Sequence, residues 1–173
     1  MDPNNQKNPL IIRIINGVSE VSGYISAFSI LISAIIITIT VLLRYLFDYT
    51  TVWQMELTIY FLMFATFVGG AYGLKHDAHV GVDVITEKLP VKMKSMLRII
   101  TSLGALLVTV ILVIQGWSMW YEALELGWRS SSAWGPPLSV SYFILPLGMT
   151  FISLQFLVII YEEIVVLFKK EKS

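Results

Sequence analysis

The residues best suited to chemistry are gathered in one polar segment, 73–90, with the sequence GLKHDAHVGVDVITEKLP. His76 and His79 stand three residues apart, which places both imidazoles on one face of a helix. Imidazole and carboxylate groups bind zinc or iron, so a metal site is one interpretation. No HExxH pattern is present, and two histidines in one short segment disfavour haem held between helices. A solvated loop is therefore favoured. The carboxylates of the segment belong to Asp77, Asp83 and Glu87.

The composition indicates which solvent surrounds the rest of the chain. Of the 173 residues, 56% are hydrophobic and 14% are charged, whereas soluble domains usually carry about 25% charged residues. A chain of this length cannot hide so much apolar surface from water, so we expect lipid around it. Twelve basic and twelve acidic residues leave no net charge, which gives a nucleic-acid partner no electrostatic support. The absence of cysteine excludes thiol catalysis and sulfur-ligated metals.

Four stretches without a charged residue are long enough, or nearly so, to cross a membrane. About 30 Å of hydrocarbon needs roughly 20 helical residues. Strands of a membrane barrel would be shorter and would alternate polar with apolar residues. The sequence therefore predicts an all-α integral membrane protein with four transmembrane helices in a single domain. The charge-free stretches are 21–43, 57–74, 99–121 and 130–161.

The basic residues predict the orientation of these helices. With the N-terminus inside, ten lysines and arginines fall in inner segments, whereas Arg44 and Arg129 fall in outer loops. This bias predicts that both termini are cytoplasmic. The five tryptophans fall at or near the expected outer boundary, where indole rings are favoured.

The boundaries of the segments follow from the same runs. We expect a short amphipathic interfacial helix at 8–19, because Asn8 and Pro9 suit a helix start and the following apolar residues share one face. The alternative is that these residues are the first turns of the first span. Pro146 should kink the last span or shift its beginning. The expected spans are 21–47, 52–74, 93–122 and 139–168, with a cytoplasmic loop at 75–92 and a periplasmic loop at 123–138.

The inventory of ionisable groups argues against a pore or carrier that acts alone. No acid, base or histidine lies within the charge-free stretches, although proton relays and ion pathways need such groups inside the membrane. Neutral carbonyls and hydroxyls could still form a sodium site, but no broken helix pair is predicted to build one. The serines at 130–132 have no histidine on their side of the membrane, which argues against a serine hydrolase.

Arg44 and Glu56 flank the first expected outer loop. In the reduced dielectric near the membrane interface, an arginine and a carboxylate are expected to pair. The alternative is a snorkelling arginine beside an unrelated acid. The residues around them include no nucleophile, so catalysis is not expected here.

Small and amide residues within the spans are candidates for helix contacts. Ala65, Gly69 and Gly73 form a row, flanked by Gly70, that lets helix backbones approach closely. The partner is either another helix of this chain or a helix of another subunit. The amides within the spans should find hydrogen-bond partners inside the chain; they belong to Gln115 and Gln155.

The order and placement of several motifs resemble a known family. The motifs, in order, are Arg44, Trp53, Glu56-Leu57, Gly69-Gly70-Ala71, His79-Val80, Asp83 and Leu89-Pro90. Together with four spans and inner termini, they are similar to the small membrane subunit of tripartite ATP-independent periplasmic (TRAP) transporters. Each motif alone is loose, whereas the combination is specific.

The resemblance implies a function. In this family a large membrane subunit of about a dozen spans carries the sodium and substrate sites, and a periplasmic binding protein delivers an organic acid. The chain would be a scaffold subunit in a bacterial inner membrane, neither an enzyme nor a cofactor carrier, with sodium bound by the large subunit. Dicarboxylates, sialic acid and other carboxylate-bearing solutes stay open. Candidates for subunit contact or docking are Arg44, Trp53, Glu56, Gly69, Gly70, Gly73, His79 and Asp83.

A second hypothesis uses the polar segment. It is a metal- or haem-binding membrane subunit of an electron-transfer complex, with His76 and His79 as ligands. Metal analysis and an absorption spectrum of the purified chain would separate it from the transporter hypothesis.

Overall fold

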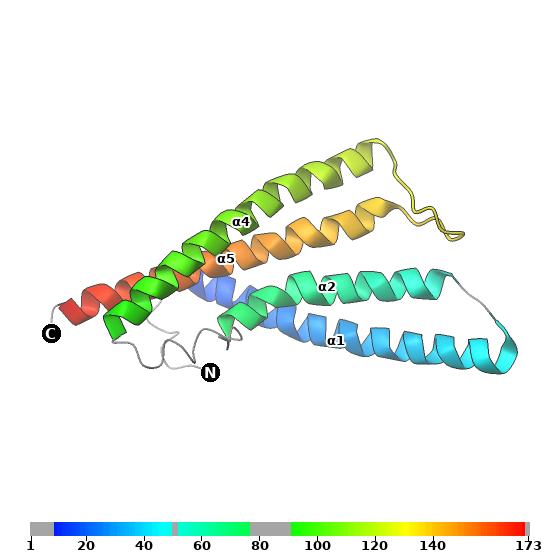
Figure 1. The fold of residues 1–173 in the computed structure, drawn as a ribbon, viewed down its shortest axis with the longest axis horizontal. Helices are drawn as coiled ribbons and strands as arrows, with labels where there is room; N and C mark the ends of the chain where they lie inside the picture. Colours follow the sequence, from blue (N-terminus) through cyan, green and yellow to red (C-terminus); the bar gives the residue numbers. More distant parts are fainter. Residues whose placement is uncertain (1–8, 50–51, 77–90, 172–173) are drawn as a thin grey trace.

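The computed structural model describes residues 9–49, 52–76 and 91–171. In these ranges the chain is all-α, and each helix is long and apolar enough to cross a membrane. The predicted fold class is thereby confirmed. The helices, labelled as in Figure 1, are α1 (Leu10–Phe47), α2 (Trp53–Lys75), α4 (Val91–Glu125) and α5 (Leu138–Glu171).

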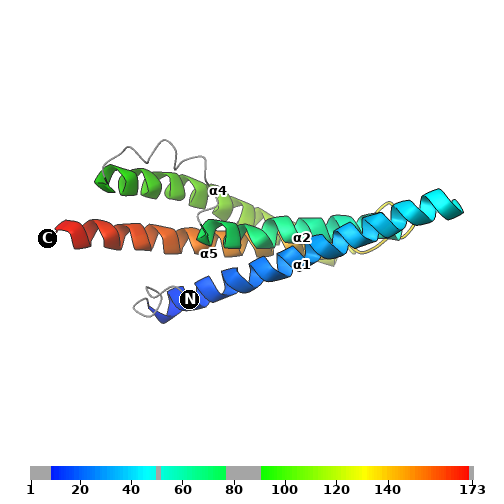
Figure 2. The same cartoon turned by 90° about the horizontal axis from the view of Figure 1, so that it is seen from below.

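The helices are arranged as two neighbouring antiparallel hairpins. α1 packs on α2 and α4 packs on α5, while α2 and α5 lie side by side between the other two (Figures 1 and 2). We call the end with the α1–α2 and α4–α5 turns the hairpin end, and the opposite end, where α1 begins and α5 ends, the termini end. This layout leaves the outer helices α1 and α4 widely exposed. In α4, 11% of the residues in its most apolar stretch are buried.

α1 is one uninterrupted helix, which corrects the expected division into a helix at 8–19 and a span at 21–47. The residues around the expected break include no proline, and a formed helix extends through Gly17 at modest cost. Residues 10–19 are therefore the first turns of α1. A helix of 38 residues is about 57 Å long, so it exceeds the hydrocarbon thickness. The placement of its first turns in the membrane interface stays a prediction.

The remaining helices agree with the predicted spans to within three residues at each end. α1 ends at Phe47, and the C-cap residue Asp48 adopts a left-handed conformation with φ 51° and donates its N–H to the Leu43 carbonyl. α5 begins directly after Pro136-Pro137. Pro146 lies fully buried inside α5 and does not shift its beginning.

The packed faces of the outer helices consist mainly of small residues. In α4, every seventh residue from Ser95 to Ala123 is buried. In α1, five serines at alternating spacings of three and four share one face, which we call the serine face. Several of these hydroxyls bond to carbonyls three or four residues earlier, as Ser33 does at 2.8 Å. The buried serines are Ser19, Ser22, Ser26, Ser29 and Ser33.

Large apolar side chains of α1 point away from α2 instead. Phe28 and Leu31, for example, are exposed. This is the reverse of a soluble amphipathic helix. Lipid is as apolar as leucine, so helices in a membrane gain more from close backbone approach between small residues.

Candidate functional site

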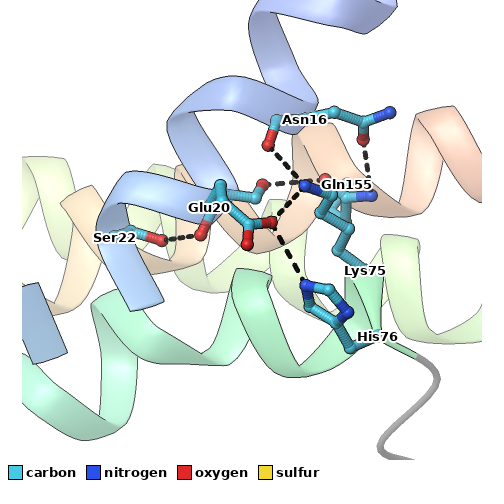
Figure 3. A network of polar contacts seen from close by, with 7 residues as sticks. Asn16, Glu20, Ser22, Lys75, His76 and Gln155 are labelled. Carbon is cyan, nitrogen blue, oxygen red and sulfur yellow. Dashed lines mark hydrogen bonds and ion pairs between the residues drawn. The ribbon is translucent and has the colours of Figure 1, made fainter. Parts of the chain in front are cut away.

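Buried amide and hydroxyl groups join α1 to α5 near the termini end (Figure 3). The Gln155 side chain of α5 accepts a hydrogen bond from Ser19 at 2.8 Å and donates one to Asn16 Oδ1 at 3.2 Å. Gln155 is 2% exposed, so these bonds satisfy an amide that lipid could not solvate. The prediction that Gln155 pairs inside the chain is confirmed.

The last turn of α2 adds charged contacts to the same place. Lys75 forms an ion pair with Glu20 of α1 and also donates to the Asn16 carbonyl oxygen at 3.1 Å. His76 Nε2 lies 3.1 Å from Glu20 Oε2. Glu20 lies just outside the charge-free stretch 21–43, and hydrogen bonds, first from Lys75 and then from His76, lower the pKa of its carboxyl. These six residues form the termini-end cluster: Asn16, Ser19, Glu20, Lys75, His76 and Gln155.

His76 is the one histidine of the polar segment that the structure describes. Besides Glu20, its ring contacts Tyr72, with ring centroids 4.3 Å apart. In the described ranges, no three histidine, cysteine, aspartate or glutamate side chains are grouped so that they could hold a metal ion. The other histidine and the three carboxylates of the segment lie outside the described residues; they are His79, Asp77, Asp83 and Glu87.

A further ion pair links the second hairpin at the termini end. Arg98 of α4 donates to Glu163 of α5 at 3.0 Å, and the Glu163 side chain is 14% exposed. Both residues lie outside the charge-free stretches. Charged groups therefore connect helices within this chain, just outside the charge-free stretches.

Glu56, at the hairpin end, is held by the α4–α5 loop and not by Arg44. Its Oε1 accepts a hydrogen bond from the Ser130 hydroxyl, while its Oε2 is buried and has no partner among the described residues. The expected pairing of Arg44 with Glu56 is wrong. Successive residues on a helix point about 100° apart. Met55 faces a groove between α1 and α2 that Arg44 also lines, whereas Glu56 faces the α4–α5 hairpin.

The glycines of α2 are used inside the chain. A Cβ atom on Gly69 would lie 2.9 Å from the Ser26 side chain of α1, and one on Gly70 would lie 2.7 Å from Ile152 of α5. Gly73 is half-buried. The structure therefore favours the first alternative for the small-residue row, a partner helix in the same chain.

The tryptophans gather at the hairpin end. Trp117 and Trp120 of α4 pack edge-to-face and both contact Phe143 of α5. Trp53, the first residue of α2, is 44% exposed. Among the docking candidates, Arg44 and Trp53 are thus the described residues that stay exposed.

Gln115 contradicts the sequence prediction. It is exposed on α4 and has no hydrogen bond to any described residue, although internal pairing was expected for it as for Gln155. The reason is the layout: α4 packs on α5 along a narrow small-residue face, and Gln115 lies beside Gly116 and not on that face.

Comparison with known proteins decides the family. Residues 33–165 match the family model described as tripartite ATP-independent periplasmic transporters, DctQ component. The chain belongs to the DctQ family. The resemblance drawn from its motifs is confirmed.

Two curated relatives show how far the DctQ likeness extends. The chain is 25% identical over 145 residues to the C4-dicarboxylate TRAP transporter small permease protein DctQ of Vibrio cholerae serotype O1, covering 72% of this chain and 62% of the relative. It is 26% identical over 140 residues to the ectoine TRAP transporter small permease protein TeaB of Halomonas elongata, covering 81% and 72%. The match thus spans less than two thirds of the Vibrio protein.

The DctQ match begins at residue 33, within α1. The α2 and α5 residues of the termini-end cluster therefore lie inside the matched region, whereas Asn16, Ser19 and Glu20 precede it. No family motif pointed to the cluster. The sequence did indicate one member of the cluster, because Ser19 is the first of the regularly spaced serines of α1.

Proposed function

We propose that the chain is the small scaffold subunit of a TRAP-type transporter, supporting a larger membrane subunit in sodium-coupled uptake of an organic acid from a periplasmic binding protein. The DctQ match over residues 33–165 carries this proposal. The two relatives are named for different solutes, a C4-dicarboxylate and ectoine. The solute class is therefore proposed from the family resemblance and not from either relative.

The placement of polar groups supports a scaffold role. The ion pairs Lys75–Glu20 and Arg98–Glu163 each join two helices near the termini end. Within the spans, Gln155 is hydrogen-bonded to α1 through both its amide oxygen and its amide nitrogen. These groups fix helices to one another, which is what a rigid support requires.

The exposed face of α4 is our candidate for contact with the large subunit. Gln115 presents an amide there that has no hydrogen bond to any described residue, and it lies within the charge-free stretch 99–121. A polar side chain from a neighbouring transmembrane helix would satisfy this amide, whereas lipid tails cannot. Gly104, about three turns away on α4, has open space around it, which leaves room for a neighbouring backbone.

The hairpin end is our candidate for docking of the binding protein. The distribution of basic residues predicts that this end faces the periplasm. It presents exposed aromatic side chains, including Trp53 and the 86% exposed Tyr45. Aromatic residues are enriched in protein interfaces.

Co-purification from native membranes tests the subunit proposal. A tagged chain should bring down a larger multi-span protein, and Gln115→Leu should lower the recovered partner about threefold or more. Gln115 is exposed, so the thermal stability of the isolated variant should match that of the wild type. Recovery of the same partner at full yield by Gln115→Leu would remove α4 from the proposed interface. A chain that is always recovered alone would contradict the subunit role itself.

A further inference from the structure

A groove of about 170 Å³ runs between α1 and α2 near the hairpin end. Ile37 and Val41 of α1 and Met55 of α2 form apolar walls. Thr40 and Thr58 also line it, but both hydroxyls donate to helix carbonyls, at 2.7 Å to Ile36 and 2.8 Å to Gln54. With their hydrogens used internally, these threonines can offer mainly methyl groups. The groove is therefore suited to hydrocarbon.

Arg44 lines the same groove at its hairpin end. It lies in the last turn of α1, where the helix dipole favours a cation. In residues 9–49, 52–76 and 91–171, no ion pair or hydrogen bond is found for its side chain. Glu56 is turned toward Ser130, and no carboxylate is among the described residues that line the groove. The guanidinium thus has five N–H donors and no anionic partner among the described residues.

We propose that this groove binds an anionic phospholipid, with an acyl chain along α1 and α2 and the phosphate at Arg44. Ile37 and Arg44 are seven residues apart, about 10 Å along the helix, which suits the upper part of an acyl chain. Arg44 directly follows the charge-free stretch 21–43, so its charge lies where hydrocarbon gives way to headgroups. A guanidinium binds phosphate oxygens through two parallel hydrogen bonds.

The pairing of a cation with an apolar groove distinguishes a lipid from other partners. An acidic side chain of another protein would neutralise Arg44 but would leave the groove unfilled. A neutral acyl compound would fill the groove but would leave the guanidinium without an anion. An anionic phospholipid satisfies both surfaces. This inference is independent of the proposed function, and it gives Arg44 a role other than docking.

Binding of phosphatidylglycerol to the purified full-length chain, measured by native mass spectrometry, tests the proposal. We expect one bound lipid on the wild type, and about tenfold weaker binding to Arg44→Gln, because a charge-assisted contact is lost. Val41→Trp should also weaken binding, since the indole would fill the groove and Arg44 would be untouched. Arg129→Gln is the matched control, because Arg129 also lies at the hairpin end, where it donates to the Gly135 carbonyl at 3.5 Å. It should bind like the wild type.

Two results would overturn the lipid site. One is wild-type binding of phosphatidylglycerol by both Arg44→Gln and Val41→Trp. The other is equal weakening by Arg44→Gln and Arg129→Gln, which would indicate general attraction of an anion to any arginine. Arg44 and Val41 are both exposed, so neither substitution should prevent folding, and circular dichroism of each variant checks this.

Discussion

Gly148→Ala should destabilise the isolated chain by roughly 2 kcal/mol, although alanine is the better helix former. A Cβ atom at this position of α5 would lie 2.4 Å from the carbonyl carbon of Phe67 and 2.5 Å from its oxygen. Backbone atoms cannot rotate away as a flexible side chain can. The methyl group would therefore push α5 from α2, and these two helices form most of the contact between the hairpins.

Gly104→Ala is the control for this prediction. Gly104 lies within the spanning part of α4, and a Cβ atom there would have no neighbour within 4 Å. Its stability should equal or slightly exceed that of the wild type, because the substitution adds helix propensity and no clash. Thermal unfolding of both variants in one detergent measures the difference. Equal behaviour of the two variants would mean that α2 and α5 are not packed as closely as the structure has them.

Ser26→Leu should destabilise the chain by roughly 2 kcal/mol, whereas Ser26→Ala should leave it unchanged or more stable by up to about 1 kcal/mol. Ser26 is 4% exposed and lies where Gly69 brings α2 close. Leucine would not fit between the helices. The serine hydroxyl is buried without a hydrogen-bond partner among the described residues, so its removal relieves a desolvated polar group.

Thr38→Leu on the same helix is the comparison. Thr38 is exposed, so leucine there faces lipid and should change stability by less than about 0.5 kcal/mol. Unfolding in detergent again provides the measurement. A stabilising effect of leucine at position 26 would show that the serine face is not the packed face of α1.

The helices could be predicted because what makes a segment span a membrane is a local property of the sequence. A span must be apolar and free of charge over about 20 residues, and this requirement can be read along the chain without knowledge of any contact. The bounds of α2 and α5 therefore agree closely with the prediction. The first turns of α1 were assigned differently, because amphipathic character alone does not determine whether a helix continues or breaks.

The pattern of apolar residues does not identify the packed faces of α1 and α4, and the reason is physical. A search for apolar faces finds the core of a soluble protein, whereas in lipid the contact face is the small and weakly polar one. The serines from Ser19 to Ser33 carried this signal in their spacing. The glycine row of α2 was recognised by the same principle, and it does contact α1 and α5.

Long-range polar contacts could not be read from neighbouring positions. Arg44 and Glu56 are close in sequence, yet Glu56 bonds to Ser130, which lies 74 residues later. Likewise, Gln155 meets Asn16 across 139 residues. Such pairs depend on how the hairpins pack, which the sequence pattern did not reveal.

Two family-matching positions stay predictions. His79 and Asp83 lie outside the described residues, so their proposed part in subunit contact rests on the motif resemblance alone.

Uptake into proteoliposomes tests most directly whether the chain is an accessory subunit. The vesicles would contain the chain alone, the co-purifying large subunit alone, or both, each with the binding protein and a labelled organic acid outside. We expect uptake only when both subunits are present and a sodium gradient points inward. Uptake through this chain alone, or full uptake by the large subunit without it, would contradict the scaffold role.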